Sequence, residues 1–273
     1  MTPDTQTVSA TDRRSRLASI VESAAGWSVP VGHAFGTQVR LHGSLILLIG
    51  LYASYCAVQL HPLHTAWYVL LTVAIYFCGL LHELGHTLAA RRFGIRTRVI
   101  LMHPLGGVAQ LEALPGDPRA HLFVALAGPA VSLVIAGFCA ALIFASGGAS
   151  IDVMRASFWL SMLCQLAWFN TLFVVLNMLP AYPMDGGRVL WSILAMCASH
   201  STARRVTSCV GLAASAGITA LAVWIAPQLI PAALLITVLG FMARDPELRS
   251  IATDAADDPE DEATLRSTPQ EVN

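Results

Sequence analysis

Two histidines and a glutamate lie within five positions, at the end of a long apolar stretch. His82 and His86 are four residues apart, so on an α-helix they share one face and both imidazoles can bind one cation. Glu83 lies about 100° round the helix from His82, offset from the pair but able to reach a water held there. This H-E-x-x-H pattern is typical of zinc proteases, in which the metal lowers the pKa of water and the glutamate takes its proton.

The alternative interpretation of this motif is a helix that carries two histidines by chance, hydrogen-bonded in a core. The apolar surroundings weaken that alternative, because each unpaired polar group inside a membrane costs several kcal/mol. Catalytic zinc takes three protein ligands and a water, so a third ligand must come from elsewhere in the chain.

Asp185 is the acidic residue best placed to be the third ligand. It lies in "NMLPAYPMDGGRVL", where Pro180 and Pro183 break the helix and the following glycine pair allows a turn and a close approach. The alternative is an ordinary proline- and glycine-rich loop at the membrane surface. Both motifs fall at the same end of apolar segments, which favours a single site at one depth.

The elements that must position these residues are apolar helices. The chain has 273 residues, of which 55% are hydrophobic and 12% charged, and its mean hydropathy is +0.63. We predict an α-helical polytopic membrane protein with about six transmembrane helices, each near the twenty-residue length that a bilayer requires. The expected spans are residues 42–60, 65–90, 120–146, 156–180, 206–226 and 229–243. A net charge of −1 gives no indication of nucleic-acid binding.

The segment between the second and third spans does not have a helical pattern. Residues 97–112 are β-branched and apolar around a Pro and a Gly-Gly pair, which predicts a small membrane-associated β-hairpin, and residues 35–41 resemble a further strand. We divide the chain into a polar N-terminal segment (1–32), a membrane-embedded domain (33–251) and a disordered acidic tail (252–273). Asn170, inside the fourth span, is expected to hydrogen-bond across helices.

The arginines indicate the orientation of the spans. All 16 basic residues are arginine, and only Arg155 falls in a loop on the opposite side from the rest. Because positive residues mark the cytoplasmic side, both termini are expected to be cytoplasmic. A plasma-membrane location follows if the source is bacterial.

Four stretches resemble the site-2 protease family of intramembrane zinc metalloproteases, peptidase family M50. They are "HELGH" (residues 82–86), "HPLGGVAQLE" (103–112), "AGPAVSLVIA" (127–136) and "NMLPAYPMDGG" (177–187), and the similarity covers roughly residues 33–200. The resemblance implies cleavage of transmembrane segments of single-pass, often regulatory, membrane proteins. Some relatives carry PDZ or CBS regulatory domains, and neither is expected in this chain.

The resemblance also implies roles for individual residues. One Zn²⁺ per chain would be held by His82, His86 and Asp185, with Glu83 as general base and later proton donor. Asn177 would hold the substrate or the oxyanion. The strand around Gly106 and Gly107 would present an edge to an unwound substrate.

Three other interpretations compete with an intramembrane protease. A catalytically silent relative would bind membrane helices without cutting them, but such a protein has no need of Glu83. A metal transporter would need access from both faces, whereas the ionisable groups cluster at one end. CAAX-type membrane proteases also use H-E-x-x-H, but they lack the Asp-Gly-Gly element.

Overall fold

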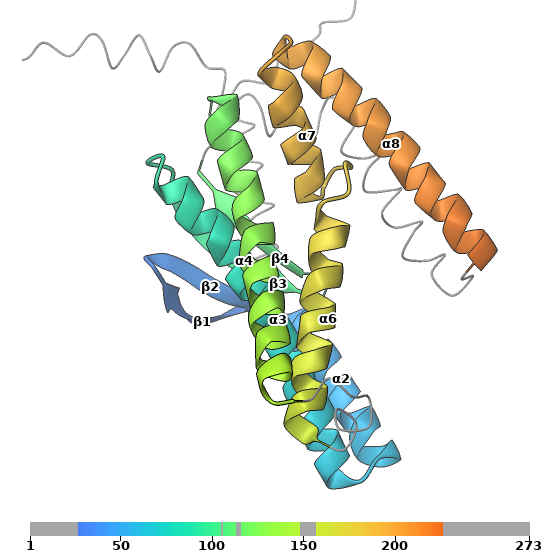
Figure 1. Cartoon of the computed structure of the whole chain (residues 1–273). Helices are drawn as coiled ribbons and strands as arrows, with labels where there is room; N and C mark the ends of the chain where they lie inside the picture. Colours follow the sequence, from blue (N-terminus) through green and yellow to red (C-terminus); the bar gives the residue numbers. More distant parts are fainter. Residues whose placement is uncertain (1–26, 105, 113–115, 148–156, 226–273) are drawn as a thin grey trace, which may run out of the picture.

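Long helices dominate the fold, and a small sheet lies against them (Figure 1). The computed structural model describes residues 27–104, 106–112, 116–147 and 157–225. The helices are α2 (Gly43–Gln59), α3 (Pro62–Arg91), α4 (Pro118–Ala145), α6 (Phe158–Asn177), α7 (Asp185–Ala195) and α8 (His200–Ile225). The bundle that carries the site consists of α3, α4 and α6, with α7 packed against α4.

Three of the described helices, α3, α4 and α6, are long and apolar enough to cross a membrane. Helix α3 has 30 residues and therefore extends about 45 Å, more than the roughly 30 Å of a bilayer core. Helix α2 is apolar but has only 17 residues. The first five expected spans coincide with helices, whereas the sixth (229–243) and the acidic tail lie outside the described residues.

The sheet is larger than the sequence predicts. The expected hairpin between the second and third spans is confirmed as β3 (Thr97–His103) and β4 (Gly106–Leu111). It continues through a parallel pairing of β3 with β2 (Thr37–His42) into β1 (Ser28–Ala34), which gives the order β1-β2-β3-β4. Strand β2 matches the further strand expected at residues 35–41, whereas β1 and the pairing of β2 with β3 were not predicted.

Strand β1 has a weak sequence signal for a physical reason. It is an edge strand with most of its side chains exposed, so no alternation of buried and exposed positions marks it. Its pairing is also interrupted by an irregularity between Pro30 and Gly32. The strand begins at Ser28, ahead of residue 33, where we place the start of the membrane domain; that boundary stays a prediction.

The inner strands pack against the helix that carries the H-E-x-x-H motif. Ile100 and Met102 of β3 form a buried cluster with Leu45 of α2 and Leu84 of α3. Ile100 is fully buried, and removing such a side chain typically costs about 2–5 kcal/mol. This cluster holds the sheet against α3, and its member Leu84 is the residue next to Glu83.

Helix α7 (Asp185–Ala195) is not predicted from the sequence. The sequence suggests a broken turn around the Asp-Gly-Gly motif, but Asp185 is instead the first residue of an 11-residue helix. Neither glycine of the motif has a positive φ. A Cβ at Gly186 would collide with the backbone of Met178 and Leu179, so the glycines serve close packing of the helix start rather than a turn.

Candidate metal centre

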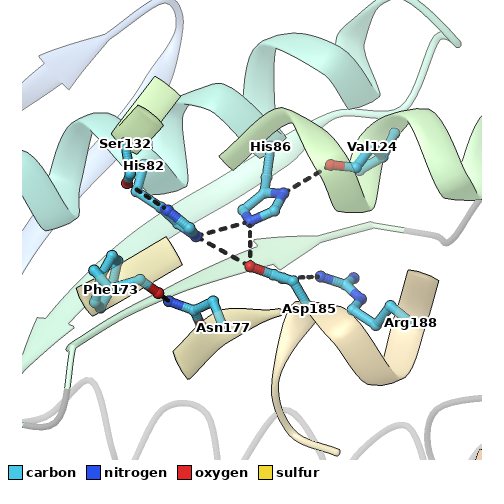
Figure 2. Close-up of polar contacts among 8 residues, drawn as sticks. All are labelled: His82, His86, Val124, Ser132, Phe173, Asn177, Asp185 and Arg188. Atoms are coloured by element: carbon cyan, nitrogen blue, oxygen red, sulfur yellow. Dashed lines mark hydrogen bonds and ion pairs between the residues drawn. The ribbon is translucent and has the colours of Figure 1, made fainter. Parts of the chain in front are cut away.

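Three side chains from distant parts of the chain converge on one point (Figure 2). His82 Nε2 lies 3.1 Å from Asp185 Oδ2, His86 Nε2 lies 3.2 Å from the same oxygen, and the two nitrogens are 3.2 Å apart. All three residues are buried, and they form a group that can hold a metal ion. The structure thus brings together the three ligands expected from the sequence.

The chemistry of this donor set fits a cation. The Nδ1 atom of His86 lies 2.7 Å from the Val124 carbonyl oxygen, so it must carry the ring proton, which leaves a lone pair on Nε2 in the neutral ring. When His82 Nδ1 likewise donates to Ser132, three acceptor atoms face one another, an arrangement that needs a shared proton or a cation between them. The separations also match zinc, since tetrahedral ligands at 2.0–2.1 Å from the ion are about 3.3 Å apart.

Helix α4 orients both imidazoles through contacts with their Nδ1 atoms. His82 Nδ1 lies 3.0 Å from the hydroxyl of Ser132, a fully buried residue, just as His86 Nδ1 contacts the Val124 carbonyl. Outer hydrogen bonds of this kind fix the tautomer and the ring orientation of metal-binding histidines. Ser132 was not predicted to be a site residue. A serine inside an otherwise apolar helix is the feature of the sequence that could have indicated it.

The same face of α4 allows the histidines to approach closely. Residues Val124, Gly128 and Ser132 are four positions apart and therefore lie along one face of the helix. A Cβ at Gly128 would collide with the Nε2 atoms of both histidines, so only glycine leaves room for the rings at this position. Gly128 belongs to the stretch 127–136 that resembles the family. That it makes room for the two histidines could be seen only in the structure.

Asp185 is held at the candidate site by its own helix. Its second carboxylate oxygen, Oδ1, lies 3.8 Å from Arg188 Nη1 one turn further along α7, which leaves Oδ2 for the site. Burial acts to raise the pKa of the Asp185 carboxyl, but the two adjacent imidazoles outweigh it and hold that pKa well below its ordinary value. Arg188 entered the sequence analysis only as an orientation signal, so this ion pair is a new element of the site.

Glu83 follows His82 on α3, and its side chain lies against the sheet. The backbone of Ala109 on β4 hydrogen-bonds its carboxylate. A Cβ on Gly107 would collide with the Glu83 side chain, so this glycine permits the close approach of β4 to α3. Strand β4 therefore fixes the glutamate, and it is also an edge strand of the described sheet.

The remaining expected site residues do not contact the three ligands. Asn177 is the last residue of α6, and its Nδ2 donates to the Phe173 carbonyl 3.0 Å away; no described hydrogen bond joins it to the ligands. Gly106 has a φ of 130° and opens the turn into β4. Phe173 is a further neighbour that the sequence analysis missed, since its ring packs edge-on against His82 with centroids 4.9 Å apart.

The fold and this site define the class of protein: a membrane protein with a metalloprotease-type site at one end of its helices. The sequence profile of peptidase family M50 matches residues 70–154 and 148–221, so the chain belongs to that family. The expected family is therefore confirmed.

Individual relatives agree with this assignment. A zinc metalloprotease of Methanocaldococcus jannaschii is 28% identical over 185 residues, covering 68% of this chain and 51% of the relative. The protein Rip3 of Mycobacterium tuberculosis is 29% identical over 61% of this chain and 44% of its own length. The chain thus spans about half the length of these relatives.

A solved structure has a similar fold. The site-2 protease from Methanocaldococcus jannaschii superposes with a TM-score of 0.55 at 23% identity, covering 79% of this chain and 94% of that chain. At this identity the likeness concerns the fold, and it agrees with a helical membrane protein that carries a small sheet.

Proposed function

We propose that this protein is an intramembrane zinc endopeptidase that cleaves transmembrane segments of single-pass membrane proteins. The proposal depends on the convergence of His82 Nε2, His86 Nε2 and Asp185 Oδ2, which lie within 3.2 Å of one another. Glu83 is the residue next to His82 on α3. Three buried acceptors are the ligand set of a catalytic zinc that keeps its fourth position for water. One zinc ion per chain would satisfy them.

Each residue of the site has a distinct task in this proposal. A bound zinc ion would supply a Lewis acid for the attacking water and the scissile carbonyl. The Glu83 carboxylate takes the proton of the attacking water and later passes it to the leaving amine. The Val124 carbonyl holds His86 in one tautomer, Ser132 orients the His82 ring, and Arg188 holds the aspartate. Asn177, the last residue of α6, would donate to the developing oxyanion once its amide leaves the Phe173 carbonyl.

The substrate would bind as an additional strand. In a helix, peptide carbonyls are occupied by hydrogen bonds and the scissile bond is shielded, so a transmembrane segment must unwind before it is cut. The edge of β4 begins at Gly106 and Gly107, beside Glu83, and it offers backbone groups to an extended chain. Pairing there would align the unwound segment along the site.

We further propose an arrangement for the whole chain. Six spans would place both termini in the cytoplasm and the site near the cytoplasmic face, within a membrane-embedded domain of residues 33–251. The surrounding bilayer would be the plasma membrane in a bacterium. Regulation by PDZ or CBS domains is not part of this proposal.

Zinc content and cleavage together test the function. Detergent-purified wild type should contain about one zinc per chain, and His86→Ala and Asp185→Ala should lose it or bind it at least about tenfold more weakly. Glu83→Gln should keep the zinc yet lose cleavage of a single-pass transmembrane peptide by a factor of about 10² or more. Full zinc retention in Asp185→Ala, or undiminished cleavage by Glu83→Gln, would refute the proposed site or mechanism respectively.

A further inference from the structure

A cavity of about 340 Å³ lies between α3, α6 and the turn that joins β3 to β4. Its walls are mainly apolar, and the functions proposed above for the site residues make no use of it. The residues that matter for its use are Thr72, Gly79, Met102, Gly106, Asn170 and Phe173. Its size falls within the range of sites that enclose small ligands or large side chains.

The cavity lies next to the candidate metal centre, and Phe173 belongs to both. Gly79 lies one helical turn before His82 on α3, and Phe173 both lines the cavity and packs against the His82 ring. Gly106, at the start of the β4 edge, closes its other side. From this end the cavity follows α3 back to Thr72, ten residues or about 15 Å from His82, towards the interior of the expected membrane.

One buried polar group in its wall lacks a partner. Asn170 is 1% exposed, and its Nδ2 donates to the Leu166 carbonyl of its own helix at 2.9 Å, which corrects the expectation of a bond across helices. Its Oδ1 has no hydrogen-bond partner among the described residues. The hydroxyl of Tyr76, another polar group of the wall, is already directed at the Pro104 carbonyl. Because Asn170 is almost completely buried, its amide oxygen is not accessible from the cavity, and the surface offered to a bound side chain is apolar.

We propose that this cavity is a specificity subsite, which receives one substrate side chain next to the scissile bond. This inference rests on the proposed protease function and names the residue class that the enzyme prefers. The apolar walls select a large apolar side chain, such as Leu or Phe, over Ala. A substrate backbone paired with the β4 edge would pass the mouth of the cavity at Gly106.

The first test changes the size of the cavity. A Cβ on Gly79 would lie 3.6 Å from Met102 Cε, an ordinary contact, so Gly79→Leu can fill the cavity from the α3 side. Gly137→Leu is the matched control, because nothing lies within 4 Å of a Cβ at that position on α4. The substrates are single-pass transmembrane peptides in which each residue within three of the cut is varied among Ala, Leu, Phe, Tyr and Trp.

At one position, wild type and Gly137→Leu should prefer large side chains to Ala by at least about tenfold in kcat/KM. Gly79→Leu should remove or reverse that preference. Each variant should contain as much zinc as wild type, which confirms an intact metal site. Identical size profiles for Gly79→Leu and Gly137→Leu would overturn the inference.

A second test does not depend on cleavage. The Glu83→Gln protein, loaded with zinc, is mixed with the same peptide carrying a benzophenone side chain at each varied position, and cross-links are mapped by mass spectrometry. Cross-links to residues 72–79 and 169–176 support the subsite, and cross-links confined to other surfaces overturn it. If wild type cuts no peptide, the proposed function fails, whereas the cross-link map still decides whether the cavity binds a side chain.

Discussion

A single methyl group on α4 is expected to disable the metal centre. In Gly128→Ala the new Cβ would lie 2.6 Å from His82 Nε2 and closer still to His86 Nε2. Real Cβ contacts are not shorter than 3.0 Å, so His82 Nε2 must move by at least about 0.4 Å. Zinc ligands tolerate errors of only about 0.2 Å, so both imidazoles are forced out of the binding geometry.

The size of the effect follows from this displacement. Losing an outer hydrogen bond of a zinc ligand typically weakens binding about 10- to 100-fold, and here two ligands themselves are displaced. We therefore expect zinc affinity to fall at least about 100-fold, or about 2.7 kcal/mol. Ala at position 128 also precedes Pro129 inside the helix, where the proline ring disfavours a Cβ, so the usual gain from replacing glycine in a helix is not expected.

Competitive titration of zinc against a chelator of known affinity measures this change. The control is Gly137→Ala in the same helix, where nothing lies within 4 Å of the added Cβ. It should bind zinc as wild type does and unfold at the same or a higher temperature, since alanine favours a helix over glycine by about 1 kcal/mol. Wild-type zinc affinity in Gly128→Ala would show that the histidines can move apart freely, and the close-packed description of the site would be wrong.

Three further substitutions test the neighbours of the site. Ser132→Ala should weaken zinc binding about 10- to 100-fold, measured by the same titration, because one histidine loses its orienting partner; an unchanged affinity would contradict that role. Arg188→Gln should have a smaller effect, at most about tenfold, because the ion pair with Asp185 is 3.8 Å long and its arginine side chain is 25% exposed. Gly107→Ala should leave zinc content unchanged but lower kcat/KM at least about tenfold, because the added Cβ displaces Glu83; unchanged peptide cleavage would exclude this coupling.

The convergence of His82, His86 and Asp185 could be predicted from the sequence because their physical signals are strong. Ionisable side chains are costly in an apolar segment, so His82, Glu83 and His86 stand out from their neighbours. Asp185 is marked by its proline- and glycine-rich surroundings. For the same reason the spans near α3, α4 and α6 coincide with the observed helices.

The elements and residues that were not predicted have weak or non-local signals in the sequence. Strand β1 is exposed and irregular, and its pairing with β2 depends on contacts that no local pattern encodes. Helix α7 begins with Asp-Gly-Gly, a sequence that disfavours a helix, yet tight packing against the preceding loop overrides that propensity. Gly128 looked like a generic small residue, because its importance depends on two rings that belong to another helix.

The parallel pairing of β2 with β3 has a consequence for how the protein is assembled. These neighbouring strands are joined by the whole of α2 and α3, so the chain leaves the sheet along α2, turns at residues 60–61 and returns along α3 before β3 can pair. The sheet can be completed only if the end of α3 returns to the side from which α2 starts. A chain in which α3 is misplaced therefore cannot bring β4 to Glu83, so the sheet and the candidate site must form together.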